Sequence, residues 1–122
     1  MGFFKFLKPE DHLHIAVCRY ITAEYSGIKI HHSPNEGKRT PFQRWLISML
    51  RVSSGFPDLL LIYKNKMIIV ELKTDTGTAT VSQKEWITLL KESGVPSAIC
   101  KGFDKTKLFI DDQFAPLKKG LK

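Results

Sequence analysis

Three ionisable residues lie at the borders of the most apolar stretch of the chain, the segment GFPDLLLIYKNKMIIVELK at positions 55–73. Asp58 precedes the first apolar run of this segment, and Glu71 and Lys73 follow the second. The short KNK turn between the runs predicts a β-hairpin, in which directly opposed Cβ atoms lie about 4.5–5.5 Å apart. Two carboxylates at that separation repel each other unless one takes up a proton or a cation binds between them. A hard cation such as Mg²⁺ fits this position, because it prefers oxygen ligands and retains several waters.

The pairing register of the hairpin decides which of these groups meet. A two-residue loop at 64–65 places Asp58 opposite Glu71, whereas a loop at 65–66 places Asp58 opposite Lys73. Either register brings the three groups to the open end of the hairpin, where Lys73 can neutralise a phosphate or position a water. The alternative is an ordinary solvated strand end, whose surface ion pair contributes less than ~1 kcal/mol. The apolar flanks and the net charge of +7 favour the cation site.

The surrounding sequence predicts an α/β fold, a mixed sheet flanked by helices. Helix starts are indicated by Pro9, by Thr40-Pro41, and by Ser82, which has capping-box spacing to Glu85. The remaining short apolar runs predict strands. In chain order we expect a helix at 9–25, a strand at 28–32, a helix at 41–52, the hairpin, a helix from 82 to about 94, strands at 97–100 and 107–110, and a loose basic tail from 116.

The composition is that of one globular domain. Hydrophobic residues make up 43% of the 122 residues and charged residues 25%, which argues against disorder. No stretch approaches the roughly 20 apolar residues of a membrane span. Cys18 and Cys100 are isolated, which argues against a zinc site and a disulfide scaffold. We therefore expect a protein of the cytoplasm, of bacterial or phage origin. The positive charge favours a polyanionic partner, nucleic acid or an anionic membrane surface, and of these we expect DNA and no membrane.

The hairpin residues also carry a family pattern. Pro57-Asp58, followed by Glu71-Leu72-Lys73, resembles the PD-(D/E)XK pattern of a large nuclease superfamily. The segments PEDHLHIAVCRYI, HHSPNEGKR, GFPDLLL and IVELKTDTGTATVSQKEWITLLKESGVPSAIC are similar to the VRR-NUC family of that superfamily. This resemblance implies a single domain over 1–122 with a restriction-endonuclease-like core at about 9–112 and a basic C-terminal tail at 113–122.

The resemblance implies roles for the hairpin residues. Asp58, Glu71 and the backbone carbonyl of Leu72 would bind one or two Mg²⁺ or Mn²⁺ ions, and Lys73 would be the catalytic lysine. Gln83, near the start of the third helix, would support the site by contacting water, Lys73 or a phosphate.

The first helix would supply one further acid by the same resemblance. Glu10 would reach the metal through water or bind a second metal, and Asp11 is the competing choice. The chain departs from the family at His14, four residues after Glu10, where the family often has a glutamine. That departure makes the helix assignment weaker than the hairpin assignment.

Two polar loops supply candidates for holding a nucleic acid. Lys38 and Arg39 lie in SPNEGKRT and suit contacts to phosphates. Thr74 and Thr76 lie in TDTGTAT, directly after Lys73, in a segment suited to gripping substrate beside the site.

Rings elsewhere in the chain are expected to be structural. Of the adjacent His31 and His32, one should be packed and one exposed, because neighbouring side chains of a strand point in opposite directions. A phosphate or metal contact is the alternative for this pair. Trp45 and Trp86 lie on the apolar faces of predicted helices, where packing in the core or in a dimer is favoured over stacking on bases.

The resemblance therefore implies a metal-dependent deoxyribonuclease that hydrolyses phosphodiester bonds inside a DNA strand, with a preference for branched or four-way-junction DNA. Stand-alone members resemble junction resolvases, which implies a homodimer. One alternative is a restriction-like, sequence-specific nuclease, and another is a nucleic-acid-binding module of the same fold that no longer catalyses. The carboxylate pair disfavours the last, because acidic groups repel DNA phosphates.

Overall fold

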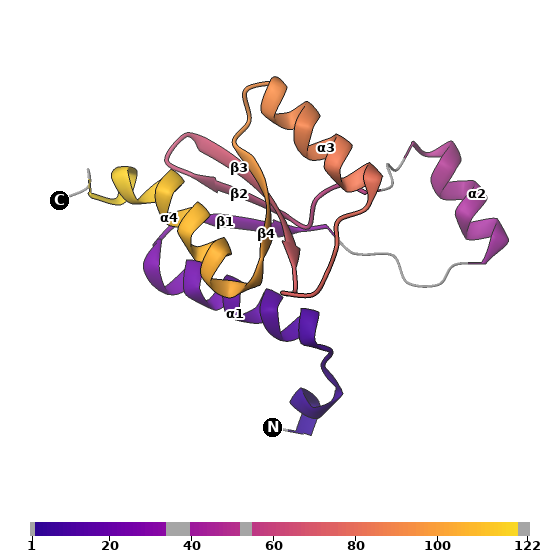
Figure 1. The fold of residues 1–122 in the computed structure, drawn as a ribbon, viewed down its shortest axis with the longest axis horizontal. Coiled ribbons are helices and arrows are strands. Elements are labelled where there is room, and N and C mark those ends of the chain that lie inside the picture. Colours follow the sequence, from indigo (N-terminus) through magenta and orange to yellow (C-terminus); the bar gives the residue numbers. More distant parts are fainter. Residues whose placement is uncertain (1, 34–39, 52–54, 120–122) are drawn as a thin grey trace.

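The fold is given by a computed structural model, which describes residues 2–33, 40–51 and 55–119. Within these segments, four strands form one sheet in the order β1-β2-β3-β4 (Figure 1). β1 (Lys29–His32) pairs antiparallel with β2 (Leu59–Tyr63), and β2 pairs antiparallel with β3 (Lys66–Lys73). β3 pairs parallel with β4 (Ser97–Lys101). The sheet is mixed, as predicted, and β2 and β3 are the predicted hairpin.

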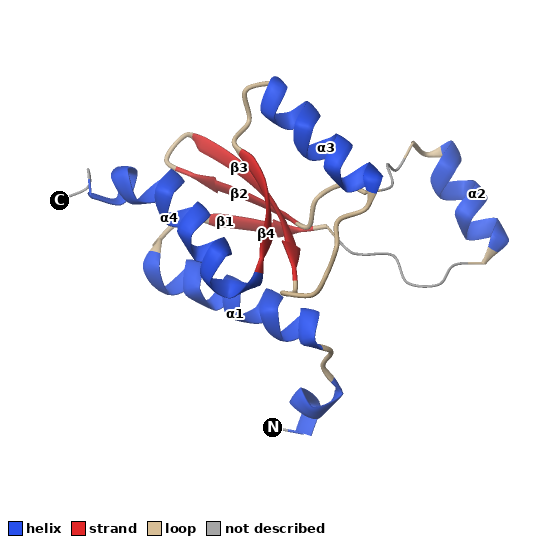
Figure 2. Cartoon of the chain, viewed as in Figure 1, coloured by secondary structure: helices blue, strands red, loops and turns tan. Residues whose placement is uncertain are grey.

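Helices cover both faces of this sheet (Figure 2). A short 3-10 helix, η1 (Gly2–Phe6), precedes α1 (Pro9–Glu24), and α2 (Pro41–Met49) follows β1. α3 (Val81–Glu92) connects β3 to β4, and α4 (Gly102–Lys119) follows β4. Figure 1 places α1 and α4 side by side on one face and α3 on the other, whereas α2 stands away from the sheet. Among the described segments, no helix combines the length and the apolar character needed to cross a bilayer.

The main hydrophobic core lies between the sheet and the pair α1 and α4. Strand alternation directs Ile68, Val70 and Leu72 of β3 to this face. The buried cluster that they join comprises Val17, Ile21, Tyr25, Leu59, Leu61, Tyr63, Ile68, Val70, Leu72, Cys100, Ile110 and Phe114. By the same alternation Ile69 points to the opposite face, the side on which α3 buries Ile87. Glu71 and Lys73 follow Ile69 at two-residue steps, so they also point to the α3 side.

The strand predicted at 107–110 is wrong, because these residues belong to α4. A four-residue apolar run is compatible with a strand or with one turn of a helix, and packing decides between them. Thr106, Ile110 and Phe114 are spaced by four residues and are fully buried, which is the pattern of a helix face. The core therefore continues past the boundary expected at 112, and residues 113–119 of the expected tail are helical.

The N-terminal caps of α2 and α3 can be compared with the caps predicted from the sequence. Thr40 caps α2 as predicted, with its hydroxyl accepting a hydrogen bond from the Gln43 N–H at 3.1 Å. α2 ends at Met49, earlier than the predicted 52. The predicted cap of α3 is wrong, because Thr80 and not Ser82 occupies that position. Two overlapping capping-box spacings exist two residues apart, and the structure uses the first.

Candidate active site

The open end of the hairpin has the first of the two predicted registers. Tyr63 pairs with Lys66, so the loop is 64–65, and both of its residues have positive φ. Leu59 pairs with Val70, which brings the preceding Asp58 opposite Glu71. The two acids are 3% and 1% exposed, so they are buried although they stand at the end of the strands.

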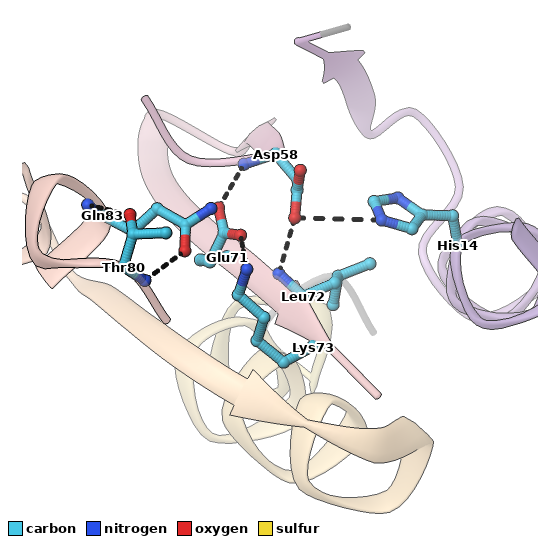
Figure 3. Close-up of polar contacts among 7 residues, drawn as sticks. All are labelled: His14, Asp58, Glu71, Leu72, Lys73, Thr80 and Gln83. Carbon is cyan, nitrogen blue, oxygen red and sulfur yellow. Dashed lines mark hydrogen bonds and ion pairs between the residues drawn. The ribbon is translucent and has the colours of Figure 1, made fainter. Parts of the chain in front are cut away.

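Each acid is held by the backbone of the strand that carries the other (Figure 3). The Leu72 N–H donates to Asp58 Oδ2 at 2.9 Å, and the Asp58 N–H donates to Glu71 Oε1 at 3.2 Å. These bonds continue the pairing of β2 and β3 beyond Leu59 by means of side chains. The carboxylates are therefore fixed by the hairpin itself and need no loop to position them.

Burial and the Asp58 charge together raise the pKa of Glu71 to about 7. Lys73 opposes this shift, since its Nζ lies 3.1 Å from Glu71 Oε2. The buried pair thus holds a proton until near-neutral pH, and a divalent cation can supply the same compensation for the repulsion. The donor set consists of carboxylate oxygens with a lysine beside them, which fits a hard cation such as Mg²⁺ or Mn²⁺.

A second set of polar groups lies on the other side of Asp58. His14 Nε2 of α1 is 3.8 Å from Asp58 Oδ2, and the ring of His14 lies 4.7 Å from that of His32, between centroids, at a 45° tilt. One ligand atom from each of His14, His32 and Asp58 lies within 4.8 Å of the other two. Burial lowers the pKa of His14, which favours the neutral imidazole that a metal ion can bind.

The histidines differ from expectation. His31 and His32 are both exposed, so the prediction of one packed ring is wrong. His32 comes to the site because β1 pairs with β2 up to Leu59 and the Ser33 N–H donates to the Asp58 carbonyl at 2.7 Å. His14 was not among the predicted site residues. The available signal was its position one helical turn after Glu10, where the family pattern has a different residue.

Residues 12–104 match the family model of the VRR-NUC domain, which is most of the chain. The chain belongs to the VRR-NUC family. It is also similar to a solved structure described as a VRR_NUC domain protein, with a TM-score of 0.72 and 24% sequence identity over 89% of this chain and 92% of that chain. This likeness supports the predicted restriction-endonuclease-like α/β fold. Comparison with the curated proteins gave no match. Membership of the VRR-NUC family implies a nuclease-type function.

In this VRR-NUC domain, Gln83 also has a structural role, which the predicted cap at Ser82 overlooked. Its Oε1 accepts a hydrogen bond from the Thr80 N–H at 2.8 Å, which completes the cap of α3. Figure 3 places the side chain on the Glu71 side of the site, away from His14. Gly55, before Asp58, lies close against this end of α3, because a Cβ on Gly55 would lie only 2.5 Å from Ser82 Cβ.

The two acids of α1 have different surroundings. Asp11 Oδ2 accepts a hydrogen bond from the Lys8 N–H at 2.9 Å and so takes part in capping the helix. Both acids line a cavity of about 800 Å³ that His14 and His32 also line, and Glu10 is the more exposed of the two. Among the described residues, Glu10 does not join the close group formed by the two histidines and Asp58.

The remaining candidates are the loop residues. Thr74 is partly buried and Thr76 is exposed, and both lie in the segment that leaves β3 directly after Lys73. The Thr74 carbonyl accepts a hydrogen bond from the Gly77 N–H at 3.0 Å, which turns the loop back beside the strand end. Lys38 and Arg39 lie outside the described residues.

Proposed function

We propose that this protein is a metal-dependent DNA endonuclease whose active site is the open end of the β2–β3 hairpin. The observation that carries the proposal is the buried, directly opposed pair Asp58 and Glu71 with Lys73 bound to one of its members. A pair of buried acids costs folding free energy, and a merely structural strand end has no need of it. In a VRR-NUC domain, a site for a divalent cation accounts for this cost.

Asp58, Glu71 and the backbone carbonyl of Leu72 would hold the cation. The exposed Glu10 is favoured over Asp11 as a further contact through water or at a second metal, because Asp11 is engaged in the helix cap. When bound, Mg²⁺ or Mn²⁺ supplies a water of lowered pKa and compensates the charge that builds up on the phosphate.

The side chains around the cation site have separate proposed roles in orienting water and in binding DNA. Lys73 adds a positive charge beside Glu71, where it can orient a water or a phosphate oxygen. Gln83 offers its amide NH₂ group, since its carbonyl oxygen is engaged in the cap of α3. Thr74 and Thr76, together with Lys38 and Arg39, are the proposed contacts to the DNA backbone, and the net charge of +7 favours association with a polyanion.

Branched DNA, including four-way junctions, is the proposed substrate, and a homodimer is the proposed active form. The apolar face of α2 supports a dimer, because Phe42, Trp45 and Met49 are each more than half exposed. Trp45 is therefore not packed in the core of the domain. Trp86, in contrast, packs against Phe56, with ring centroids 5.0 Å apart. Trp45→Glu should convert the dimer to a monomer. Light scattering of the wild type that gave a mass near 13.9 kDa at micromolar concentration would exclude the dimer.

We place this activity in the cytoplasm of a bacterium or of a phage-infected cell. Cys18 and Cys100 are free thiols, as suits a reducing compartment.

The deciding experiment compares cleavage of labelled linear duplex, single strand, flap and four-way junction in Mg²⁺, Mn²⁺ or EDTA. Lys73→Ala is the test variant, and Lys66→Ala, at the other end of β3, is the matched control. We expect metal-dependent cleavage by the wild type and the control, none by Lys73→Ala, and a preference for the junction. A preference for one sequence in linear duplex would favour the restriction-like alternative. Binding of DNA without cleavage under every condition would favour the alternative of a nucleic-acid-binding module that does not catalyse.

A further inference from the structure

The His14 side of Asp58 has polar groups that lack the bonds expected of them. The 3.8 Å between His14 Nε2 and Asp58 Oδ2 is too long for a hydrogen bond. The two rings are tilted by 45°, so parallel stacking does not explain their approach. Three elements thus bring ligating groups together without any direct bond among those groups.

The spacing of these groups matches that of ligands around one transition-metal ion. Ligands at metal bonds of about 2.0–2.2 Å lie roughly 3–4 Å from one another, which includes the observed 3.8 Å. Two imidazoles that share such an ion have ring centres roughly 4.6–5.3 Å apart, and the observed separation is 4.7 Å. All three ligand atoms lie within 4.8 Å of one another, so small side-chain rotations would complete the site.

We propose that His14, His32 and Asp58 form a binding site for a divalent transition-metal ion, of the Mn²⁺, Co²⁺, Ni²⁺ or Zn²⁺ class, in preference to Mg²⁺. Two imidazole nitrogens favour these borderline ions, whereas Mg²⁺ prefers sites made of oxygen. The site shares Asp58 with the proposed catalytic pair, whose ligands are oxygens. The binding equilibrium does not depend on the proposed nuclease activity.

The surroundings provide access and room for further ligands. His14 and His32 line the cavity of about 800 Å³ beside α1, with Glu10 at the same cavity. Three protein ligands leave coordination positions open, so water or a phosphate oxygen can enter from that cavity. His14 lies on α1, His32 ends β1, and Asp58 precedes β2, so a bound ion would also join three elements of the fold.

The direct test is titration of metal-free protein with Co²⁺, followed by visible absorption and calorimetry, with Zn²⁺ and Mg²⁺ as competitors. We expect one Co²⁺ per chain, displacement by Zn²⁺, and no displacement by excess Mg²⁺. His32→Ala should weaken Co²⁺ binding by at least about tenfold, because even residues that only support metal ligands change affinity by that much. His14→Gln should have the same effect, and circular dichroism checks that each variant is folded.

The chain offers matched controls for both histidines. His31 is the exposed neighbour of His32 on β1, and His12 is an exposed histidine of α1. His31→Ala and His12→Ala should bind Co²⁺ as the wild type does. The proposal is overturned if His32→Ala binds as tightly as His31→Ala, or if Mg²⁺ competes equally. It is also overturned if Glu71→Gln abolishes binding while His32→Ala does not, which would place the ion on the carboxylate pair.

Failure of this proposal and failure of the proposed function give different results. A protein that cleaves DNA in Mg²⁺ while His32→Ala leaves Co²⁺ binding unchanged retains the nuclease assignment and excludes the histidine site. A protein that binds Co²⁺ through His32 and cleaves none of the four DNA substrates retains the metal site and excludes the nuclease.

Discussion

Two acidic residues of different elements, Asp111 of α4 and Glu71 of β3, have contrary surroundings in the fold. Asp111 of α4 accepts hydrogen bonds from the hydroxyls of Tyr20 of α1 and of Tyr25, which caps the C-terminus of α1, and it pairs with Lys107 at 3.1 Å. Burial alone would raise its pKa, but these donors outweigh burial and lower it. Glu71 faces another acid, and its pKa is raised to about 7.

The difference separates an acid that supports the fold from an acid that the fold must accommodate. Asp111 joins α1 to α4 and has its charge compensated by protein groups. Within the described part of the chain, two backbone N–H groups and one lysine compensate the carboxylates Asp58 and Glu71 only in part. An acid left short of donors in a buried position is a candidate for binding a ligand that supplies the missing charge.

The largest expected effect is on activity at the uncompensated pair. Asp58→Asn should lower DNA cleavage by at least about a hundredfold, as loss of a charge-stabilising group does in other active sites. Its free energy of unfolding in EDTA should equal or exceed that of the wild type, because the repulsion with Glu71 is removed. Cleavage assays and urea denaturation of the same preparations measure both. A stable Asp58→Asn variant that cleaves DNA as the wild type does would contradict a catalytic role for the buried acid pair.

The opposite outcome is expected at Asp111. Asp111→Ala leaves two partly buried tyrosine hydroxyls without their acceptor and should lower the free energy of unfolding by about 2–4 kcal/mol. Cleavage per folded molecule should be unchanged. Asp112→Ala, at the exposed neighbouring position, is the control in denaturant titrations. Equal stability of the two variants would show that the tyrosine contacts do not join the helices.

The two acids should also give opposite slopes of stability against pH in metal-free protein. The pKa of Glu71 is higher in the folded state than the 4.5 of the free side chain, so stability falls as pH rises from about 4.5 to about 7, by roughly 3 kcal/mol. The pKa of Asp111 is lower in the folded state, so its contribution is lost as pH falls below the ordinary carboxyl range. Unfolding measured across pH should show both slopes. Glu71→Gln should remove only the first, and a slope that survives this substitution would contradict the assignment.

The smallest expected effect concerns Gln83. Thr80→Ala removes the hydroxyl that caps α3 and should cost about 1 kcal/mol of stability, with DNA cleavage close to that of the wild type. Gln83→Ala should in addition reduce cleavage, because it removes the amide group beside Glu71. Thermal unfolding and initial rates compare the two variants. Equal, small losses from both would assign Gln83 to the helix cap alone.

The sequence was sufficient for the hairpin because local rules determine it. The apolar runs on both sides of KNK predict the two strands, and the short turn predicts that Asp58, Glu71 and Lys73 meet at the open end. The sequence left two registers open, and the structure has the one with the loop at 64–65, which opposes Asp58 and Glu71. The family pattern added the identity of the domain. These signals all lie within one short stretch of chain, so they do not depend on how distant elements pack.

The features that were missed depend on tertiary packing or on a choice between equal local signals. The approach of His14 to His32 follows from how α1 lies against the end of β1, which no spacing in the sequence encodes. The short apolar run at 107–110 became a helix because Ile110 and Phe114 pack on the sheet. The cap of α3 fell on Thr80 rather than Ser82, although both residues have capping-box spacing.

Gly55 has a consequence for the tolerance of this protein to mutation. Its φ is +80°, and its Cα lies against the first turn of α3, so any side chain would collide with Ser82 and strain the backbone. A library with every amino acid at position 55 should therefore yield almost only glycine among active clones, although this residue has no functional group. Genetic screens would then rank it with the acids and the lysine, for a purely steric reason.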